Sequence, residues 1–266
     1  MGYAKSREDL FCACRDGNLP LIEQLLSESP RLIHARDTDS SSPLIIASYH
    51  RHSDVARFLL SNMCNVHAKD LDGNTALHMA CRAPASLPLI QVLLEHNANV
   101  QVPNIAGETP FILATSCAVA NTEVVQTLLR HGASDTSQAL LCVNPLTSLP
   151  SLEALVQHGA QVNALDSRGH SPLIRACIHD HVPSIRLLLS HGADREGRDC
   201  QGCSPLMRAL DVHSNQAAQE LVEGGADIHA PNRLGDTPFF RACRMGNLDA
   251  IYWMVRMRPV EYRHLD

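Results

Sequence analysis

Aromatic side chains are scarce in this chain of 266 residues, at 4% of the sequence, although hydrophobic residues make up 45%. The apolar mass is therefore leucine, alanine, valine and isoleucine, as in small helices that stack closely. No apolar run approaches the ~18–20 residues that a membrane-spanning helix needs, and no signal peptide opens the chain. We therefore expect a protein without a membrane span.

Positive charge and cysteine are also limited. The net charge is −6 with no basic block, which argues against nucleic-acid binding. Ten cysteines are too sparse for a disulfide scaffold, so we expect a reducing, intracellular setting in the cytoplasm or nucleus. The opening residues MGYAKS fit the loose myristoylation pattern at Gly2, but the bulky Tyr3 is a poor fit and favours an unmodified end.

What the sequence does contain is an internal repeat. The segments SRGHSPLIRA (167–176), CQGCSPLMRA (200–209) and RLGDTPFFRA (233–242) are spaced by 33 residues, and DGNTALHMA (72–80) aligns with them. Ser or Thr before Pro marks the start of a first helix. Glycines after a paired apolar step end a second helix, and Asp-x-x-Gly turns a hairpin tip. Each unit therefore reads as helix, turn, helix and protruding hairpin.

These units resemble the ankyrin-repeat family. TALHMA (75–80) and LLSHGAD (188–194) closely match the family signatures, and the pattern covers almost the whole chain. The resemblance implies an all-α solenoid of units of about 33 residues, in which each unit buries its apolar face against its neighbours. We expect one ankyrin-repeat domain over 1–266, with eight repeats at about 8–36, 37–69, 70–103, 104–136, 137–165, 166–198, 199–231 and 232–266.

Two departures from the repeat pattern each lead to a further prediction. Between Ala133 and Leu140 the chain is about six residues short and has no Asp-x-x-Gly. We therefore expect no hairpin at 133–141 and greater exposure of the inner helices beside it. A terminal repeat should present a polar face, yet Tyr252 and Trp253 lie near the end of the last unit. We expect one of them to be covered by residues 256–266, a partner or further natural sequence.

Cysteine and histidine mostly follow the repeat. One group of cysteines follows the first-helix alanine, where a small buried residue is needed, and four histidines precede the second-helix turn. These residues are Cys14, Cys81, Cys177, Cys243, His96, His131, His158 and His191. Cys200 and Cys203 have C-x-x-C spacing on a predicted exposed finger. Because zinc needs four ligands and no second pair lies at a convincing distance, we predict no metal site and no cofactor.

Enzyme motifs are absent as well. The sequence has no G-x-x-x-x-G-K-[ST], no H-E-x-x-H and no G-x-S-x-G. Scattered Ser, His and Asp could converge in three dimensions, but a one-dimensional stack offers few closed pockets. We therefore expect a binding protein rather than an enzyme.

One position of the first helix suggests where a partner binds. Leu173, Ala176 and Cys177 form a buried stripe, which places Arg175 about 200° around the helix from Leu173. In solenoids of the family that this chain resembles, the far side of the first helix lines a concave groove. Across the eight units this position reads Cys12, Ile46, Met79, Leu113, Cys142, Arg175, Arg208 and Arg241. Neighbouring groove positions are Tyr49, His50, Arg82, Ile178, His179, Arg244 and Met245.

The groove is therefore predicted to be apolar in its N-terminal half and basic in its C-terminal half. We expect a monomer that binds a segment of another protein, with acidic residues over the arginines and apolar anchors on Ile46, Met79 and Leu113. The opposing interpretation is a solvated face, because Asp211 lies three residues after Arg208 and can pair with it. Two further alternatives remain: the substrate-recognition arm of an assembly such as a ubiquitin ligase, or a redox or metal response at Cys200 and Cys203.

Overall fold

The computed structural model describes residues 2–82, 86–116, 121–142 and 149–256. Within these ranges the chain is all-helical, with sixteen α-helices, one 3-10 helix and no strand. The elements are α1 (Gly2–Asp16), α2 (Leu19–Glu28), η1 (Pro30–His34), α3 (Pro43–Tyr49), α4 (Ser53–Ser61), α5 (Ala76–Cys81), α6 (Leu87–Glu95), α7 (Pro110–Ser116), α8 (Thr122–Arg130), α9 (Thr136–Cys142), α10 (Leu149–Gln157), α11 (Pro172–Ile178), α12 (Val182–Ser190), α13 (Pro205–Asp211), α14 (Asn215–Glu223), α15 (Pro238–Met245) and α16 (Leu248–Arg256). None of these helices is long and apolar enough to cross a membrane.

The helices belong to two compact units. Met1–Asp135 with Cys142–Asn144 forms the N-terminal unit, and Thr136–Leu141 with Pro145–Asp266 forms the C-terminal unit. The sixteen helices make eight helix pairs, in agreement with the eight predicted repeats. That all eight form one domain remains a prediction.

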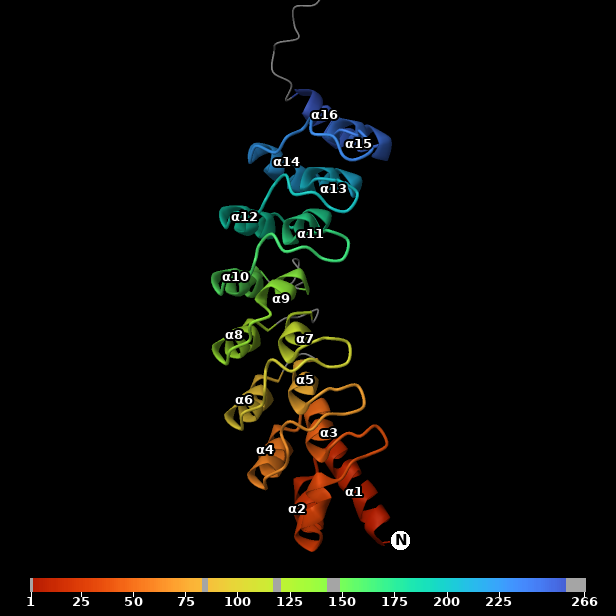
Figure 1. Ribbon diagram of the computed structural model, residues 1–266, viewed down its shortest axis with the longest axis vertical. Coiled ribbons are helices and arrows are strands. Elements are labelled where there is room, and N and C mark those ends of the chain that lie inside the picture. The colour runs from red at the N-terminus through yellow and green to blue at the C-terminus, as the bar shows by residue number, and fades with distance from the viewer. Residues whose placement is uncertain (1, 83–85, 117–120, 143–148, 257–266) are drawn as a thin grey trace, which may run out of the picture. The chain divides into compact units, whose positions relative to one another are not determined.

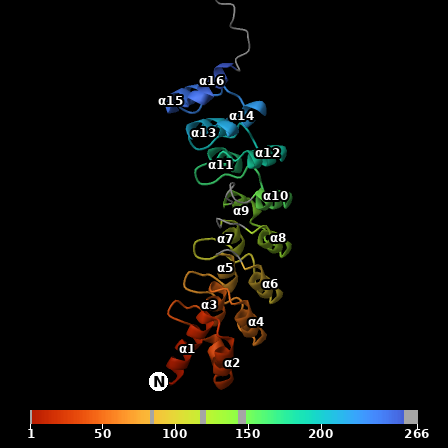
Figure 2. The same ribbon diagram turned by 180° about the vertical axis from the view of Figure 1, so that it is seen from behind.

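Within each unit, the first helices of successive repeats pack on one another, and so do the second helices. In the N-terminal unit the first helices α1, α3, α5 and α7 form one layer, and α4, α6 and α8 form the second (Figure 1). In the C-terminal unit α11, α13 and α15 stack on one side, and α10, α12, α14 and α16 on the other (Figure 2). Leu173 and Leu206 between the layers have no exposed surface. The core of each unit is therefore built by stacking neighbouring repeats, as the periodicity predicts.

The predicted helix starts are confirmed by hydrogen bonds. The hydroxyl oxygens of Ser42 and Ser171 each accept a bond of 3.2 Å, from the N–H groups of Ile45 and Ile174. Each serine precedes a proline that opens the helix. The hydroxyl satisfies an N–H that the helix cannot pair, and proline has no N–H to leave unpaired.

Hairpin fingers project from the ends of the first helices and lie side by side within each unit. The N–H of Leu71 donates to Asp39 O at 3.0 Å, and that of Ile105 donates to Asp72 O at 2.8 Å. In the C-terminal unit, Gly169 has φ +74° and a Cβ there would lie 2.7 Å from the Cys200 nitrogen. Only glycine combines this left-handed backbone with so close an approach.

One finger is missing, as predicted. Only residues 131–135 separate α8 from α9, whereas residues 96–109 separate α6 from α7. The expected exposure of the adjacent inner helices is wrong for their apolar side chains, since Leu113 and Leu140 are 7% and 2% exposed.

Candidate functional site

Two hollows lie over the first helices, one in each unit. The hollow of the N-terminal unit has a volume of about 490 Å³ and is lined by Tyr49, Arg51, Met79 and Arg82. The hollow of the C-terminal unit has a volume of about 440 Å³ and is lined by Arg168, His170, Ile178, Cys200, Gln201, Arg208, Asp211 and Val212. The structure thus brings three predicted residues together in the first hollow and two in the second.

The apolar surface of the N-terminal hollow differs from the prediction. Ile46 and Leu113 are only 9% and 7% exposed, so the expectation that both serve as open anchors is wrong. Their helices pack against neighbouring first helices, α3 against α1 and α5, and α7 against α5. Tyr49, at 59% exposure, and the partly exposed Met79 form the accessible apolar surface instead.

His50 lies beside this hollow in an aromatic cluster. Its ring meets Tyr49 edge-on at 5.1 Å between centroids and stacks on His52 at 6.4 Å. Partial desolvation lowers the pKa of His50, and the charges of Arg15 and His52 lower it further. The lowered pKa favours the neutral form of the ring, which adds polar but uncharged surface beside the hollow.

The three arginines of the C-terminal unit are not equivalent. Arg241 is 6% exposed. Its Nε donates to Asp211 Oδ1 at 2.8 Å, its Nη2 pairs with Asp211 Oδ2, and its Nη1 lies 3.5 Å from Asp236 Oδ2. The bond to Asp211 raises the pKa of Arg241. The prediction that this guanidinium faces solvent is therefore wrong, because two aspartates of neighbouring segments enclose it.

Arg208 is also occupied. Its Nε donates to Asp199 Oδ2 at 2.6 Å, and its Nη1 donates to Asp211 Oδ2 at 3.3 Å, which confirms the predicted pairing with Asp211. Burial alone would raise the pKa of Asp199, but hydrogen bonds from the Cys203 backbone and from Arg208 hold it below its usual value. Asp199 is therefore a charged acceptor inside the repeat and not a free acid.

Together these contacts form an ion-pair chain, which runs through the side chains of Asp199, Arg208, Asp211, Arg241, Asp236 and Arg244. Its last contact joins Arg244 Nη1 to Asp236 Oδ2 at 3.1 Å. Asp199 opens a finger turn, and Asp236 closes one. The ion-pair chain could not be predicted from the sequence. Aspartates in turns are expected to accept hydrogen bonds from their own backbone, and the local pattern gives no sign that they also pair with arginines.

Arg175 differs from Arg208 and Arg241, which occupy the same repeat position. It lies on α11, is partly exposed and makes no ion pair within the described ranges. Ile178, one turn later, is partly exposed, and His179 is exposed. Met245 on α15 is 41% exposed. A guanidinium next to accessible apolar surface can receive both a carboxylate and the apolar side chains around it.

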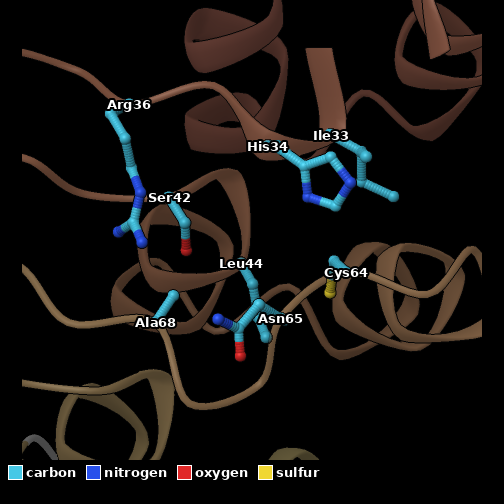
Figure 3. Close-up of a pocket in the computed structure, with 8 residues that line it drawn as sticks. All are labelled: Ile33, His34, Arg36, Ser42, Leu44, Cys64, Asn65 and Ala68. Atoms are coloured by element: carbon cyan, nitrogen blue, oxygen red, sulfur yellow. The ribbon is translucent and has the colours of Figure 1, made fainter. Parts of the chain in front are cut away.

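A third hollow lies under the first finger. It has a volume of about 200 Å³ between η1 and the turn after α4, as Figure 3 shows with Arg36, Ser42 and Cys64 among its lining residues. Arg36 is already occupied, since its Nη1 donates to Ser40 O at 2.7 Å and to Lys69 O at 3.0 Å. Burial raises the pKa of the Cys64 thiol to about 12. The guanidinium of Arg36 is thus bound within the protein, and the Cys64 thiol stays protonated.

The histidines have the predicted structural roles. The Nδ1 atoms of His96, His131, His158 and His191 lie 2.8–2.9 Å from the carbonyl oxygen four residues earlier. His78 is fully buried, accepts the Thr75 N–H at Nδ1 and meets Glu108 O through Nε2 at 3.2 Å. Desolvation lowers the pKa of His78, so it stays neutral within the stack.

Two predictions about cysteines, the exposure of Cys203 and the burial of Cys243, are wrong. Cys200 is exposed but Cys203 is fully buried, where Asn232 Nδ2 approaches its sulfur at 3.7 Å. The pair therefore does not lie together on an exposed finger. Cys243 is exposed although Cys177 is buried, because no described repeat follows α15 and α16. No group of three potential metal-binding side chains occurs in the part of the chain that the structure describes.

Comparison with known proteins agrees with this architecture. A family model described as ankyrin repeats (3 copies) matches residues 5–70, 62–139 and 140–232, and one described as ankyrin repeats (many copies) matches 213–255. The chain therefore belongs to the ankyrin-repeat family. Ankyrin repeats form protein–protein interaction domains, which agrees with open hollows rather than enclosed pockets.

Several relatives share part of the chain. The ankyrin repeat protein nuc-2 of Neurospora crassa is 27% identical over 186 residues, covering 67% of this chain and 17% of nuc-2. The probable 26S proteasome regulatory subunit p28 of Saccharomyces cerevisiae is 27% identical over 186 residues, covering 66% and 81%. The probable E3 ubiquitin-protein ligase XBOS32 of Oryza sativa is 33% identical over 100 residues, covering 37% and 20%. The chain thus spans a small part of two of these relatives.

Proposed function

We propose that this chain is an intracellular, monomeric interaction module that binds an acidic and apolar segment of another protein over its first helices. The observation that carries the proposal is the contrast between Arg175 and the two other arginines at the same repeat position. Arg208 and Arg241 already hold aspartates, whereas Arg175 makes no ion pair within the described residues. A partner carboxylate at Arg175 displaces no internal contact.

The surroundings of Arg175 support an amphipathic partner. Ile178 and Val212 supply apolar surface at the nearby hollow, where Val212 is 46% exposed. A forked bond from Arg175 to a carboxylate contributes ~1.5–3 kcal/mol when the pair is shielded from water. Apolar side chains of the partner over Ile178 and Val212 would provide that shielding.

The N-terminal hollow supports a second, more apolar contact. Tyr49 and Met79 offer aromatic and thioether surface, and Arg51 and Arg82 border it. Tyrosine and arginine contribute a large share of binding energy in many interfaces, and methionine adapts to side chains of different shape. We propose that apolar residues of the partner contact this hollow.

The proposal is tested at Arg175. A protein captured with the wild-type chain is purified and titrated against wild type, Arg175→Glu and Arg175→Lys. We expect at least a tenfold loss of affinity for the glutamate variant and a smaller loss for the lysine variant, which keeps the charge but not the fork. Wild-type affinity should fall with added salt.

The matched control is Arg57→Glu, at an exposed arginine on the second helix α4. It makes the same charge change outside both hollows and should bind like wild type. Equal affinities for wild type, Arg175→Glu and Arg57→Glu would overturn the proposal.

A second candidate role is the substrate-recognition arm of a larger assembly, as in a ubiquitin ligase. The similarity to the probable E3 ubiquitin-protein ligase XBOS32 favours this role. Under this proposal the segment bound at Arg175 belongs to a protein destined for ubiquitination, and the ligase machinery is supplied outside the described repeats.

A further inference from the structure

The last helix pair exposes apolar positions that earlier repeats bury. Phe240 of α15 is 53% exposed, whereas Met207 and Ile174, one and two repeat lengths earlier, have no exposed surface. Cys243 is exposed, and the equivalent Cys177 is fully buried. In the earlier repeats the next first helix covers these positions, and α15 has α13 on one side only (Figure 2).

The second helix of the pair continues the same surface. Ile251 of α16 is partly exposed, although the equivalent Ile185 and Ala218 have no exposed surface. Val255, one turn further along, is 49% exposed. We call Phe240, Cys243, Ile251 and Val255 the terminal face. It is apolar, like the interfaces between internal repeats.

We propose that residues 257–266 of this chain dock on the terminal face as a cap. These ten residues, MRPVEYRHLD, follow directly after Arg256 and lie outside the described ranges. The segment therefore starts at the border of the terminal face, next to Val255. A segment tethered in this way acts at a local concentration in the millimolar range, far above that of a free partner.

The length and composition of the segment suit this role. Ten extended residues reach ~33 Å, and the two helices of a repeat lie ~8–10 Å apart, so the segment can cross both. Pro259 opposes continuation of the helix. After it, Val260 and Tyr262 alternate with Glu261 and Arg263, which places one apolar and one charged side on an extended strand.

Cys243 reports directly on this cap. The full-length chain is compared with a chain that ends at Arg256, and the reaction rate of each cysteine with a thiol reagent is followed by mass spectrometry of peptides. We expect Cys243 to react at least tenfold faster in the shortened chain. Cys12 and Cys200, which are also exposed, lie outside the terminal face and should react at the same rate in both.

Two double variants identify the side of the segment that docks. Val260→Ser with Tyr262→Ser should expose Cys243 as the truncation does. Glu261→Gln with Arg263→Gln leaves the net charge unchanged and should keep Cys243 protected. Equal Cys243 rates in the full-length and shortened chains would overturn the proposal.

Protein concentration separates the cap from association of two copies. Protection by residues 257–266 should not depend on concentration, and sedimentation should give one mass across the range. Protection that grows with concentration together with a doubled mass would show that a second copy covers the terminal face, and would also overturn the proposal. Neither result depends on Arg175, so the cap and the proposed partner binding are tested independently.

Discussion

Arg241 occupies the same repeat position as Arg175, yet its environment is opposite. Asp211 and Asp236 surround Arg241 and leave it 6% exposed, whereas Arg175 is partly exposed with no ion pair among the described residues. Asp211 lies three residues after Arg208, at the repeat position that Ile178 occupies after Arg175. This one carboxylate pairs with Arg208 of its own helix and with Arg241 of the next repeat.

The ion-pair chain predicts a clear stability effect. Asp211→Asn keeps the side-chain shape but removes the charge between Arg208 and Arg241. Because Arg241 is buried, we expect the free energy of unfolding to fall by about 2–4 kcal/mol, with the remaining contact to Asp236 limiting the loss. Chemical denaturation followed by circular dichroism measures this change.

The matched control breaks an exposed pair in the same unit. Glu220→Gln removes the charge that pairs with Arg186, whose side chain is 68% exposed. Exposed ion pairs contribute little to stability, so this variant should unfold almost like wild type. Equal losses in the two variants would show that the ion-pair chain adds nothing beyond a surface contact.

At the scale of helices, short elements depend on their ends. The first helices α3, α11 and α13 have seven residues each, which is too short for stability in isolation. Each has a serine cap followed by proline. Local caps and burial against neighbours together make such helices stable, and this is why the Ser-Pro signal located them accurately in the sequence.

The cap of α11 can be tested separately from the core. Ser171→Ala removes the acceptor for the Ile174 N–H and should lower the free energy of unfolding by about 1 kcal/mol. Ser167→Ala in the exposed finger makes the same chemical change away from a helix start. Thermal unfolding that shifted equally in both variants would contradict a capping role for Ser171.

At the scale of the whole molecule, stability is shared between neighbouring repeats. Each repeat contacts those beside it, so a fragment with enough repeats keeps most of its interfaces. The N-terminal unit contains four helix pairs, α1 to α8, within residues 1–135. Such a fragment retains every contact between these helix pairs.

We therefore expect residues 1–135 to fold without the rest of the chain and to unfold cooperatively, as measured by circular dichroism at 222 nm. At least three repeats are needed for a stable stack. The control fragment, residues 1–69, contains only the first two helix pairs and should have much lower helicity and no sharp transition. An unfolded 1–135 fragment would contradict the nearest-neighbour view of this unit.

Periodicity alone located the helices, their caps and the missing finger, because these features depend on residues close together in the chain. The 33-residue spacing predicted the eight helix pairs, and the deficit after Ala133 predicted the short link before α9. The predicted exposure of Ile46, Leu113 and Arg241 failed. Helical angle places a residue on a face, but the side chains of the adjacent repeat decide whether that face meets solvent.

The sequence by itself thus determined the family, the order of elements and the structural roles of the repeated histidines. Only the tertiary structure decided which arginine remains available, since Asp199, Asp211 and Asp236 reach Arg208 and Arg241 from different segments. It also decided that Cys203 is buried and that Phe240 is open. The physical reason is that local bonding follows from the order of residues, whereas burial and ion pairing depend on which segments stacking brings together.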